Sequence, residues 1–265
     1  TELAVGDQVY GYTGVVAMGT WAEFVVVDAD ALAPAPRSVS LAQAASLPVV
    51  ALTAWQSLVT IGRLQPGQTV LVHGGAGGVG SAVIQLAKHL GATVATTASA
   101  SSAETVQQLG ADIIIDYRSE DFVQRLAETP VDIVVDTQGG EITSRSFQVL
   151  RPGGIVVGIA GTPDPSLADQ AGAGPVVKAA LSALSFKVRR QASKLGVRYR
   201  FLFIEPEGEA LRTIAGLVDD GVIQPVVDRI LPFDQALAAL DQLLAGGTRG
   251  KVLVTASEQE VTAHA

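Results

Sequence analysis

The sequence of 265 residues contains no cysteine. Disulfide bonds and thiolate metal ligands are therefore excluded within this chain. Cysteine-free chains are compatible with a reducing compartment, and we expect a cytoplasmic protein.

Charged residues and long apolar runs are also scarce. Charged residues make up 17% of the chain and the net charge is −8, so nothing in the overall charge attracts nucleic acid or an anionic membrane. The most apolar stretch, residues 41–61, is interrupted by polar residues, and we predict no membrane span. A local basic run between Lys187 and Arg200 lacks interleaved aromatic residues, which favours a solvated helix face over nucleic-acid binding.

The middle of the chain alternates between strand and helix patterns. The predicted strands are residues 69–73, 93–97, 112–115, 131–136, 154–160 and 199–204. The predicted helices between them are residues 78–90, 102–109, 119–128 and 141–150. Such alternation indicates an α/β fold with a doubly wound parallel sheet, which we place at residues 47–222.

The flanking segments have a different pattern. Residues 1–46 contain β-branched and aromatic runs, "DQVYGY" and "WAEFVVVDA", which predict short strands. Ser40 begins a helical stretch that Pro48 should interrupt. Residues 223–265 return to strand, helix and strand, as a chain rejoining the first domain would. Because the sequence opens on a β-rich pattern, we expect part of the first domain to lie outside it.

A glycine cluster joins the first strand of the alternating region to its first helix. Gly75-Ala76-Gly77-Gly78-Val79-Gly80 matches G-x-G-x-x-G in the context that dinucleotide binding requires. Glycines there allow a tight turn and a close approach to pyrophosphate, and the helix N-terminus favours its negative charge. The Lys-Ser or Lys-Thr pair of a P-loop is missing. The cluster therefore predicts a dinucleotide site.

Serines follow the second strand at the position that selects the cofactor. An NAD site typically has Asp or Glu about 20 residues after the loop, to bind the ribose 2′-hydroxyl. This sequence has "TASASSAE" there, with no acid before Glu104. Hydroxyls can donate to a 2′-phosphate and Arg118 can supply charge, so we predict NADPH as the cofactor.

Other catalytic chemistries lack support in the sequence. No G-x-S-x-G element is present, and the three histidines, His73, His89 and His264, stand far apart, so we predict no metal site. Tyr10, Tyr12 and Tyr199 are the phenols considered as proton donors, each more often a packing residue, and we assign no catalytic residue.

The ordered motifs resemble one known family. They are "GDQVYG", "WAEFVVVDADAL", "AASLPVVALTAWQSL", "GQTVLVHGGAGGVGSAVIQLAKHLGA", "LGADIIIDYRSEDF", "VDIVVDTQGG", "LRPGGIVVGIAG" and "GGTRGKVLV". Together they resemble the medium-chain dehydrogenase/reductase superfamily, specifically its zinc-independent quinone oxidoreductase branch, similar to zeta-crystallin. The resemblance implies a Rossmann domain, a partial GroES-like domain, NADPH and a homodimer. The family's opening stretch has no counterpart here.

The resemblance also implies the positions that meet the cofactor. Thr53 would lie near the phosphates or the nicotinamide ribose, and Ala76, Gly77, Gly78 and Val79 would meet the pyrophosphate. Ser99, Ser102, Tyr117 and Arg118 would surround the 2′-phosphate. Ala160 and the backbone of Phe201–Phe203 would border the nicotinamide, and Arg249 and Lys251 belong to a tail motif that returns to the cofactor.

The function that follows is hydride transfer from NADPH to a quinone or an α,β-unsaturated carbonyl, without zinc. Two alternatives stay open. The chain could be an enoyl reductase domain of a polyketide synthase, acting on thioesters, or a non-catalytic NADPH-binding protein.

Overall fold

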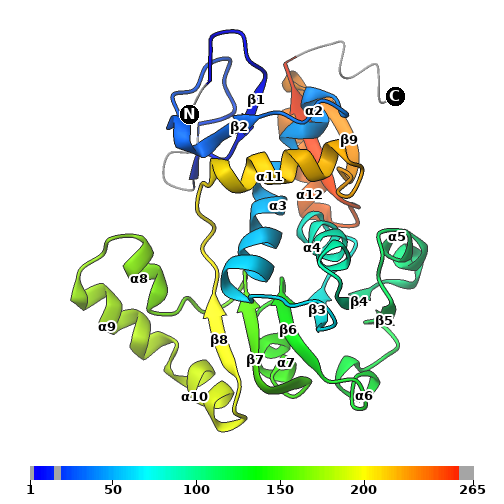
Figure 1. Cartoon of the computed structure of the whole chain (residues 1–265), viewed down its shortest axis with the longest axis vertical. Helices are drawn as coiled ribbons and strands as arrows, with labels where there is room; N and C mark the ends of the chain where they lie inside the picture. Colours follow the sequence, from blue (N-terminus) through cyan, green and yellow to red (C-terminus); the bar gives the residue numbers. More distant parts are fainter. Residues whose placement is uncertain (1–2, 15–18, 257–265) are drawn as a thin grey trace. The chain divides into compact units, whose positions relative to one another are not determined.

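The computed structural model describes residues 3–14 and 19–256 (Figure 1). Internal contacts divide the chain into two units. Unit 1 comprises residues 1–53, 77–82 and 204–265, and unit 2 comprises residues 54–76 and 83–203. Each unit is described by itself below.

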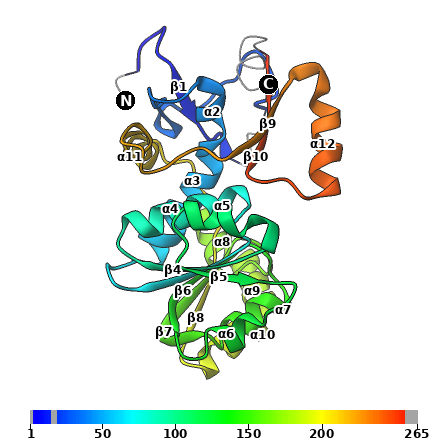
Figure 2. The same cartoon turned by 90° about the vertical axis from the view of Figure 1, so that its right-hand side faces the viewer.

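Unit 2 is built on six parallel strands. They are β3 (Thr69–His73), β4 (Thr93–Ala98), β5 (Ile113–Asp116), β6 (Val131–Asp136), β7 (Leu150–Gly158) and β8 (Arg198–Phe201). Their order in the sheet is β5-β4-β3-β6-β7-β8, which confirms the doubly wound α/β fold (Figure 2). All five residues of β3 are buried, as expected for a central parallel strand covered on both faces.

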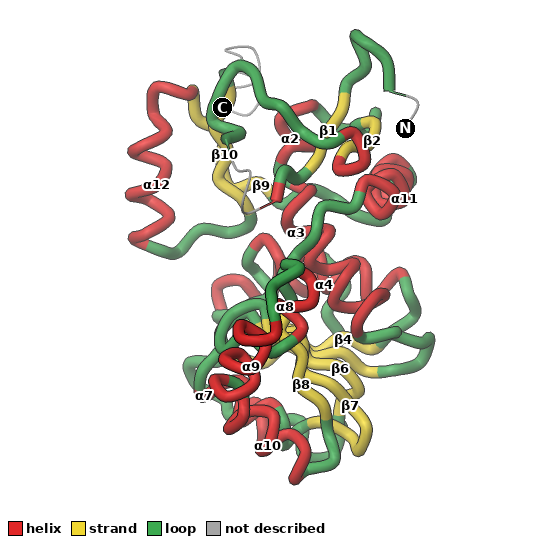
Figure 3. The backbone as a smooth tube through the Cα atoms, turned by 90° about the vertical axis from the view of Figure 1, so that its left-hand side faces the viewer, coloured by secondary structure: helices red, strands yellow, loops and turns green. Residues whose placement is uncertain are grey.

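Helices connect the strands and follow them in the predicted order. They are α4 (Gly78–His89), α5 (Ala103–Gln108), α6 (Phe122–Arg125), α7 (Glu141–Ser146), α8 (Ser166–Gln170), α9 (Pro175–Leu184) and α10 (Phe186–Lys194), with a short 3-10 helix η3 (Ala100–Ser102). Helices α8 and α10 lie beside β8 (Figures 1 and 3). Helix α6 is shorter than predicted and begins three residues later because Asp121 caps it, its side chain accepting the N–H of Val123.

The core of unit 2 lies between the sheet and its helices. Phe147 is fully buried there and meets Tyr199 edge-on, with ring centroids 6.3 Å apart. Leu71, Val134 and Ile115 from three strands belong to the same cluster. Because these residues come from β3, β6 and β5, their packing fixes the strand ends that carry the candidate site.

Unit 1 combines short strands with helices. Its elements are β1 (Val9–Gly11), η1 (Ala29–Ala31), β2 (Leu32–Pro34), α2 (Leu41–Ala45), α3 (Leu47–Trp55, continuing into unit 2), α11 (Gly208–Asp219), β9 (Val227–Pro232), η4 (Phe233–Gln235), α12 (Ala236–Ala245) and β10 (Lys251–Thr255). Strands β1 and β2 pair antiparallel, and β9 and β10 pair parallel. The π-helix η2 (Gln56–Ile61) continues α3 within unit 2.

The predicted helix start and break are both observed in unit 1. Ser40 forms a capping box with Gln43 at the start of α2. The helix is interrupted before Pro48, which lies in the first turn of α3, where proline is tolerated.

Helix α11 belongs to unit 1, although we had assigned its residues to the end of the Rossmann domain. The Tyr10 hydroxyl donates to the Leu211 carbonyl at 2.6 Å. Asp219 accepts the N–H groups of Arg37 and Ser38 at 2.7 and 2.8 Å. These contacts fasten the helix to the N-terminal segment of the chain.

The strand predicted for "WAEFVVVDA" is wrong. The stretch from Trp21 to Asp28 contains no strand, and Phe24 and Val26 are 89% and 98% exposed. Its β-branched and aromatic composition suits a strand, but a strand also requires a partner with which to form hydrogen bonds. Within residues 3–14 and 19–256, no segment pairs with it.

Substituting Phe147→Ala should lower the free energy of unfolding of unit 2 by about 3–5 kcal/mol, because it leaves a cavity in the core. Urea denaturation followed by circular dichroism measures the change. The exposed Phe186 provides a matched control: Phe186→Ala should change stability by less than about 0.5 kcal/mol. Equal effects of the two substitutions would contradict the assignment of this core.

Candidate functional site

The turn that follows β3 requires glycine at its first two positions. Gly74 has a φ of +71°, and a Cβ on Gly75 would lie 2.2 Å from the Thr96 hydroxyl oxygen. The N–H of Gly75 donates to the Thr97 carbonyl at 3.0 Å, and the N–H of Gly74 donates to the Thr97 hydroxyl at 3.0 Å. The turn is therefore held against the end of β4, and its first two residues have no side chain.

Helix α4 begins directly after this turn. Its first turn contains no acidic residue that could occupy the N-terminal anion site. The first N–H groups of a helix have no partner within the helix, and its dipole favours an anion there. The local sequence thus supplies the elements of a phosphate site.

The ends of β3, β6 and β7 lie together at one edge of the sheet. The Thr137 hydroxyl donates to the His73 carbonyl at 2.8 Å, which joins the ends of β6 and β3. A Cβ on Gly139 would lie 3.0–3.1 Å from the backbone of Ala160 and Gly161, which follow β7. Three glycine-bearing strand ends, at Gly74, Gly139 and Gly161, therefore lie side by side in unit 2. Ligands of open α/β sheets bind at this edge, where the strand order reverses.

The buried side chain of Asp136 fixes the backbone that follows β6. It is fully buried, and its carboxylate accepts the N–H groups of Gln138 and Gly139 at 2.9 and 3.0 Å and the hydroxyl of Thr143. These bonds fix the loop after β6 and the start of α7.

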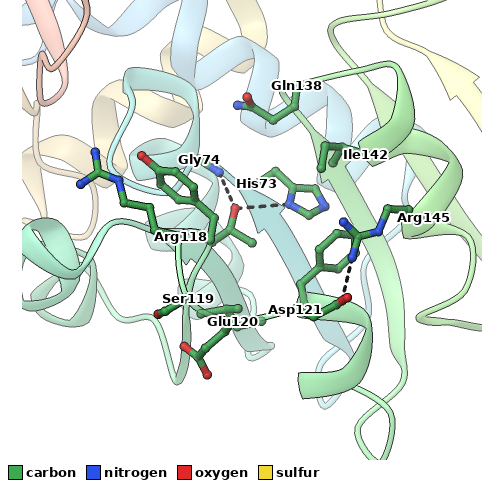
Figure 4. A pocket seen from close by; sticks show the side chains of 13 residues that line it. His73, Gly74, Arg118, Ser119, Glu120, Asp121, Gln138, Ile142 and Arg145 are labelled. Carbon is green, nitrogen blue, oxygen red and sulfur yellow. Dashed lines mark hydrogen bonds and ion pairs between the residues drawn. The ribbon is translucent and has the colours of Figure 1, made fainter.

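A pocket of about 610 Å³ opens beside the turn (Figure 4). It is formed at the ends of β3, β4 and β5 and by the starts of α6 and α7. The lining residues are His73, Gly74, Thr97, Ile115, Tyr117, Arg118, Ser119, Glu120, Asp121, Phe122, Gln138, Ile142 and Arg145. Its wall combines aromatic and aliphatic surface with hydrogen-bonding groups, as small-molecule sites commonly do.

His73 forms part of this wall as a neutral residue. It is 2% exposed, with Nδ1 3.3 Å from the Thr97 hydroxyl and Nε2 3.0 Å from the Ser146 hydroxyl. Burial lowers its pKa from the ordinary 6.5 to about 4; Asp136 opposes that shift and the Arg145 charge adds to it. Both ring nitrogens are engaged with hydroxyls, so His73 acts in the structure rather than as an exposed acid or ligand.

Arg145 and Asp121 form an ion pair at the pocket wall. The guanidinium lies 2.7 Å from the Asp121 carboxylate and stacks over the Phe122 ring at 4.9 Å (Figure 4). Sequence analysis missed this pair because its members are 24 positions apart and meet only when β5 and β6 lie in the same sheet. In the sequence, the available indication was that both residues follow predicted parallel strands, whose carboxyl ends lie on the same side of the sheet.

The residues predicted to surround a 2′-phosphate lie at this edge of unit 2. The Ser99 hydroxyl is 3.0 Å from that of Ser101 and 3.2 Å from that of Ser102, directly after β4. Tyr117 and Arg118 line the pocket, and the guanidinium lies 5.6 Å from the Tyr117 ring centroid. The Tyr117 N–H donates to the Ala98 carbonyl at 3.4 Å, which connects the two groups.

The predicted nicotinamide residues of unit 2 lie at the ends of β7 and β8. Phe201 pairs with Gly158, and Ala160 follows two residues later. The Leu202 N–H donates to the Gly158 carbonyl at 2.8 Å, and Phe203 is half-buried beyond it. Ala76, also in unit 2, lies in the glycine turn.

Other predicted residues belong to unit 1. Gly77 forms a parallel bridge with Gly250, and a Cβ on Gly78 would lie 2.9 Å from the side chain of Lys251. The tail motif therefore returns to the glycine turn within this unit. Burial lowers the pKa of Lys251.

Thr53, Val79 and Arg249 are the other predicted cofactor residues that lie in unit 1. The Thr53 hydroxyl donates to the Val49 carbonyl at 2.6 Å, and Thr53 is buried. Val79 lies in the first turn of α4, half-buried. The Arg249 N–H donates to Asp228 at 3.1 Å.

Two of the three candidate phenols are engaged in packing. The hydroxyl of Tyr10 donates to the Leu211 carbonyl, and that of Tyr199 donates to the Thr162 carbonyl at 2.8 Å. Burial is the largest cause that raises the pKa of both groups, and burial also raises that of Tyr12. A phenol that holds its proton this firmly is a poor general acid at neutral pH.

Within the described part of the chain, no group of three or more His, Asp or Glu side chains could hold a metal ion. His264 lies outside the described residues. The described helices also include none that is long and apolar enough to span a membrane.

Comparisons with known proteins identify the family. A model of the zinc-binding dehydrogenase family matches residues 109–254. The mitochondrial NAD(P)H oxidoreductase RTN4IP1 of Danio rerio is 34% identical over 262 residues, covering 96% of this chain and 67% of that protein. The polyketide synthase GfsB of Streptomyces halstedii is 34% identical over 264 residues, covering 96% of this chain and 4% of the synthase.

The solved structures agree. The quinone oxidoreductase of Coxiella burnetii has a TM-score of 0.82 and 31% identity, covering 97% of this chain and 74% of that one. The fold and the glycine turn define a Rossmann-type oxidoreductase. The chain belongs to the zinc-binding dehydrogenase family of the medium-chain dehydrogenase/reductase superfamily, in its quinone oxidoreductase branch, which confirms the family predicted from the sequence. The chain spans about two thirds of the length of the RTN4IP1 relatives it matches.

The lowered pKa of His73 predicts a pH-dependent stability. Since its pKa is about 4 in the folded chain and 6.5 when unfolded, the unfolded state binds the extra proton between these values. Stability from this residue should be complete above pH 6.5 and be lost as the pH falls toward 4, by at most about 3 kcal/mol.

Urea denaturation of the His73→Gln variant at several pH values tests this. Its stability should fall less steeply than that of the wild type between pH 6.5 and 4. His89→Gln, at an exposed position, should retain the wild-type profile. A His73→Gln profile as steep as that of the wild type would contradict the assignment.

Proposed function

We propose that the protein is an NADPH-dependent oxidoreductase that transfers hydride to a quinone or an α,β-unsaturated carbonyl. The observation that carries the proposal is the combination, at the carboxyl ends of the strands, of a tight glycine turn and a pocket whose lining includes Tyr117, Arg118 and Ser119. The named functions of the relatives, NAD(P)H oxidoreductase and quinone oxidoreductase, support it.

The donor set at this edge suits a 2′-phosphorylated dinucleotide. Three serine hydroxyls follow β4, and the Arg118 guanidinium stands at the pocket rim. Glu104, the first acid after β4, is exposed and accepts a hydrogen bond from Gln108 at 3.4 Å. Hydroxyl and guanidinium donors stabilise a phosphate dianion, whereas a carboxylate in the first position would repel it.

The pocket suits the adenosine end of the cofactor. Ile142, which is half-buried, offers apolar surface to a purine ring, and Gln138 and Arg145 offer hydrogen-bonding groups around it. A pocket of about 610 Å³ is within the range that small-molecule ligands occupy.

The chain's own residues bind and orient the cofactor. When bound, the reduced nicotinamide supplies the hydride. We assign Ala76–Val79 to the pyrophosphate, Ser99, Ser102, Tyr117 and Arg118 to the 2′-phosphate, and Ala160 with Phe201–Phe203 to the nicotinamide side. Thr53, Arg249 and Lys251, which belong to unit 1, are assigned to the cofactor from the family resemblance alone. Their task is to hold the reacting ring in one orientation and to exclude water.

Protonation of the reduced substrate is assigned to solvent. The Tyr10 and Tyr199 hydroxyls are engaged with backbone carbonyls, so neither is offered as the acid. We assign no catalytic residue in this chain. Zinc independence stays a prediction, supported by the absence of cysteine.

A second candidate is an enoyl reductase domain acting on thioesters. Two polyketide synthases, GfsB and the Streptomyces orinoci protein NorB, are 34% and 35% identical to this chain. The same hydride chemistry serves both candidates, and the substrate distinguishes them. The non-catalytic alternative would bind NADPH but would not oxidise it, whichever acceptor is supplied.

The homodimer and the cytoplasmic location also stay predictions. The named RTN4IP1 relatives are mitochondrial, whereas this location was predicted from the absence of cysteine.

Oxidation of NADPH, followed by its absorbance, tests the function across a benzoquinone, an enal and an α,β-unsaturated thioester. The proposal predicts turnover with the quinone or the enal. Turnover confined to the thioester would favour the enoyl reductase. No turnover with any acceptor, despite tight NADPH binding, would overturn the enzyme assignment.

Arg118→Ala should weaken NADPH binding about ten-fold and leave NADH binding nearly unchanged, because only NADPH carries the 2′-phosphate. Isothermal titration calorimetry measures both dissociation constants. Arg190→Ala is the matched control, since Arg190 is also a surface arginine beside an aromatic ring, with its guanidinium 5.9 Å from the Phe186 ring centroid. An equal loss of NADH and NADPH affinity in Arg118→Ala would contradict a 2′-phosphate contact.

A further inference from the structure

A second buried carboxylate lies near the ends of β7 and β8, outside the pocket. Asp164 is 3% exposed. One carboxylate oxygen accepts both the N–H of Ser166, at 2.8 Å, and the Ser166 hydroxyl. The other accepts the N–H of Phe201 at 3.1 Å. Its bonds therefore extend from the start of α8 to the last residue of β8.

The hydrogen bond from Phe201 to Asp164 satisfies one N–H group on the outer side of the edge strand β8. Successive N–H groups of a strand point to opposite sides. The Leu202 N–H donates to Gly158 in β7, so the Phe201 N–H points away from β7, and β8 is the edge strand. Asp164 supplies the acceptor that a further strand would otherwise provide.

A second bond fastens the same segment. The Tyr199 hydroxyl donates to the Thr162 carbonyl at 2.8 Å, and the ring also lies against Gly158, where a Cβ would be 3.1 Å from the hydroxyl oxygen. The segment from Ala160 to Asp164 is thus held to β8 at two points. On its other side, Gly161 packs against Gly139.

These ties join the two segments that we assign to the nicotinamide side of the cofactor. One is the backbone after β7, beginning at Ala160, and the other is the end of β8, beginning at Phe201. Neither Asp164 nor Tyr199 lines the pocket at the adenosine end.

We infer that Asp164, assisted by Tyr199, is a positioning residue that holds these two segments in register, so that the nicotinamide ring is bound in one orientation. The inference rests on the proposed function. It predicts that removing the hydrogen bonds of Asp164 or Tyr199 impairs binding of the nicotinamide end of the cofactor and leaves binding of the adenosine end unchanged.

Asp164→Asn is the test variant. Its side chain keeps its shape but has only one acceptor oxygen, so either the Ser166 bonds or the Phe201 bond loses its acceptor. Tyr199→Phe removes the second tie with little change of shape and serves if Asp164→Asn does not fold. Asp219→Asn is the matched control, since Asp219 also accepts backbone N–H groups, in unit 1.

Two ligands allow binding at the two ends of the cofactor site to be measured separately. Binding of 2′-phospho-ADP-ribose, which lacks nicotinamide, is measured by calorimetry. The fluorescence change of the reduced nicotinamide on binding and the rate of hydride transfer to a quinone are measured with NADPH. In Asp164→Asn we expect the fragment to bind within two-fold of wild type, a reduced fluorescence change, and hydride transfer slowed at least about ten-fold. Asp219→Asn should match the wild type in all three.

Two results would overturn the inference. One is wild-type fluorescence and hydride transfer in both Asp164→Asn and Tyr199→Phe. The other is a loss of fragment binding as large as the loss at the nicotinamide end, which would indicate a general structural role. Failure of the wild type itself to bind NADPH would instead overturn the proposed function.

Discussion

The turn after β3 requires glycine at its first two positions, and the arrangement of the site depends on this constraint. Gly75 lies so close to Thr96 that a methyl group would collide with the hydroxyl, and Gly74 adopts a positive φ. The backbone is consequently fixed against β4, which also places Ser99 and the pocket residue Thr97 near the same turn. Dinucleotides bind with their pyrophosphate at a glycine turn of this kind, which is followed by a helix N-terminus.

Buried carboxylates complete this edge of the sheet. Asp136 organises the loop after β6, and Asp164 organises the segment after β7; both accept hydrogen bonds from backbone N–H and hydroxyl groups. A buried carboxylate requires such donors to offset its lost hydration, so each loop has one preferred conformation. Loops held in this way suit a reaction in which the protein contributes orientation and the cofactor contributes the reactive atom.

The sequence predicted the sheet well because its signals are local. Strands β3 and β6 begin and end where predicted, since each has a run of three apolar residues at its centre and is followed by glycine or polar residues. The stretch around Phe24 was predicted as a strand from composition, but its state depends on a partner strand that local pattern does not reveal. The Asp121–Arg145 pair and the bond from Asp164 to Phe201 depend on which strands are neighbours, so both became visible only in the structure. The cofactor residues named from the resemblance are distributed over both units and stay predictions.

The central claim is that this edge of the sheet binds a dinucleotide through its 2′-phosphate. The most direct measurement compares the dissociation constants of NADPH and NADH for the unaltered protein by calorimetry under identical salt conditions. The account predicts that NADPH binds at least about ten-fold more tightly, because the serine hydroxyls and Arg118 would contact a group that NADH lacks. Equal affinities, or tighter binding of NADH, would contradict it.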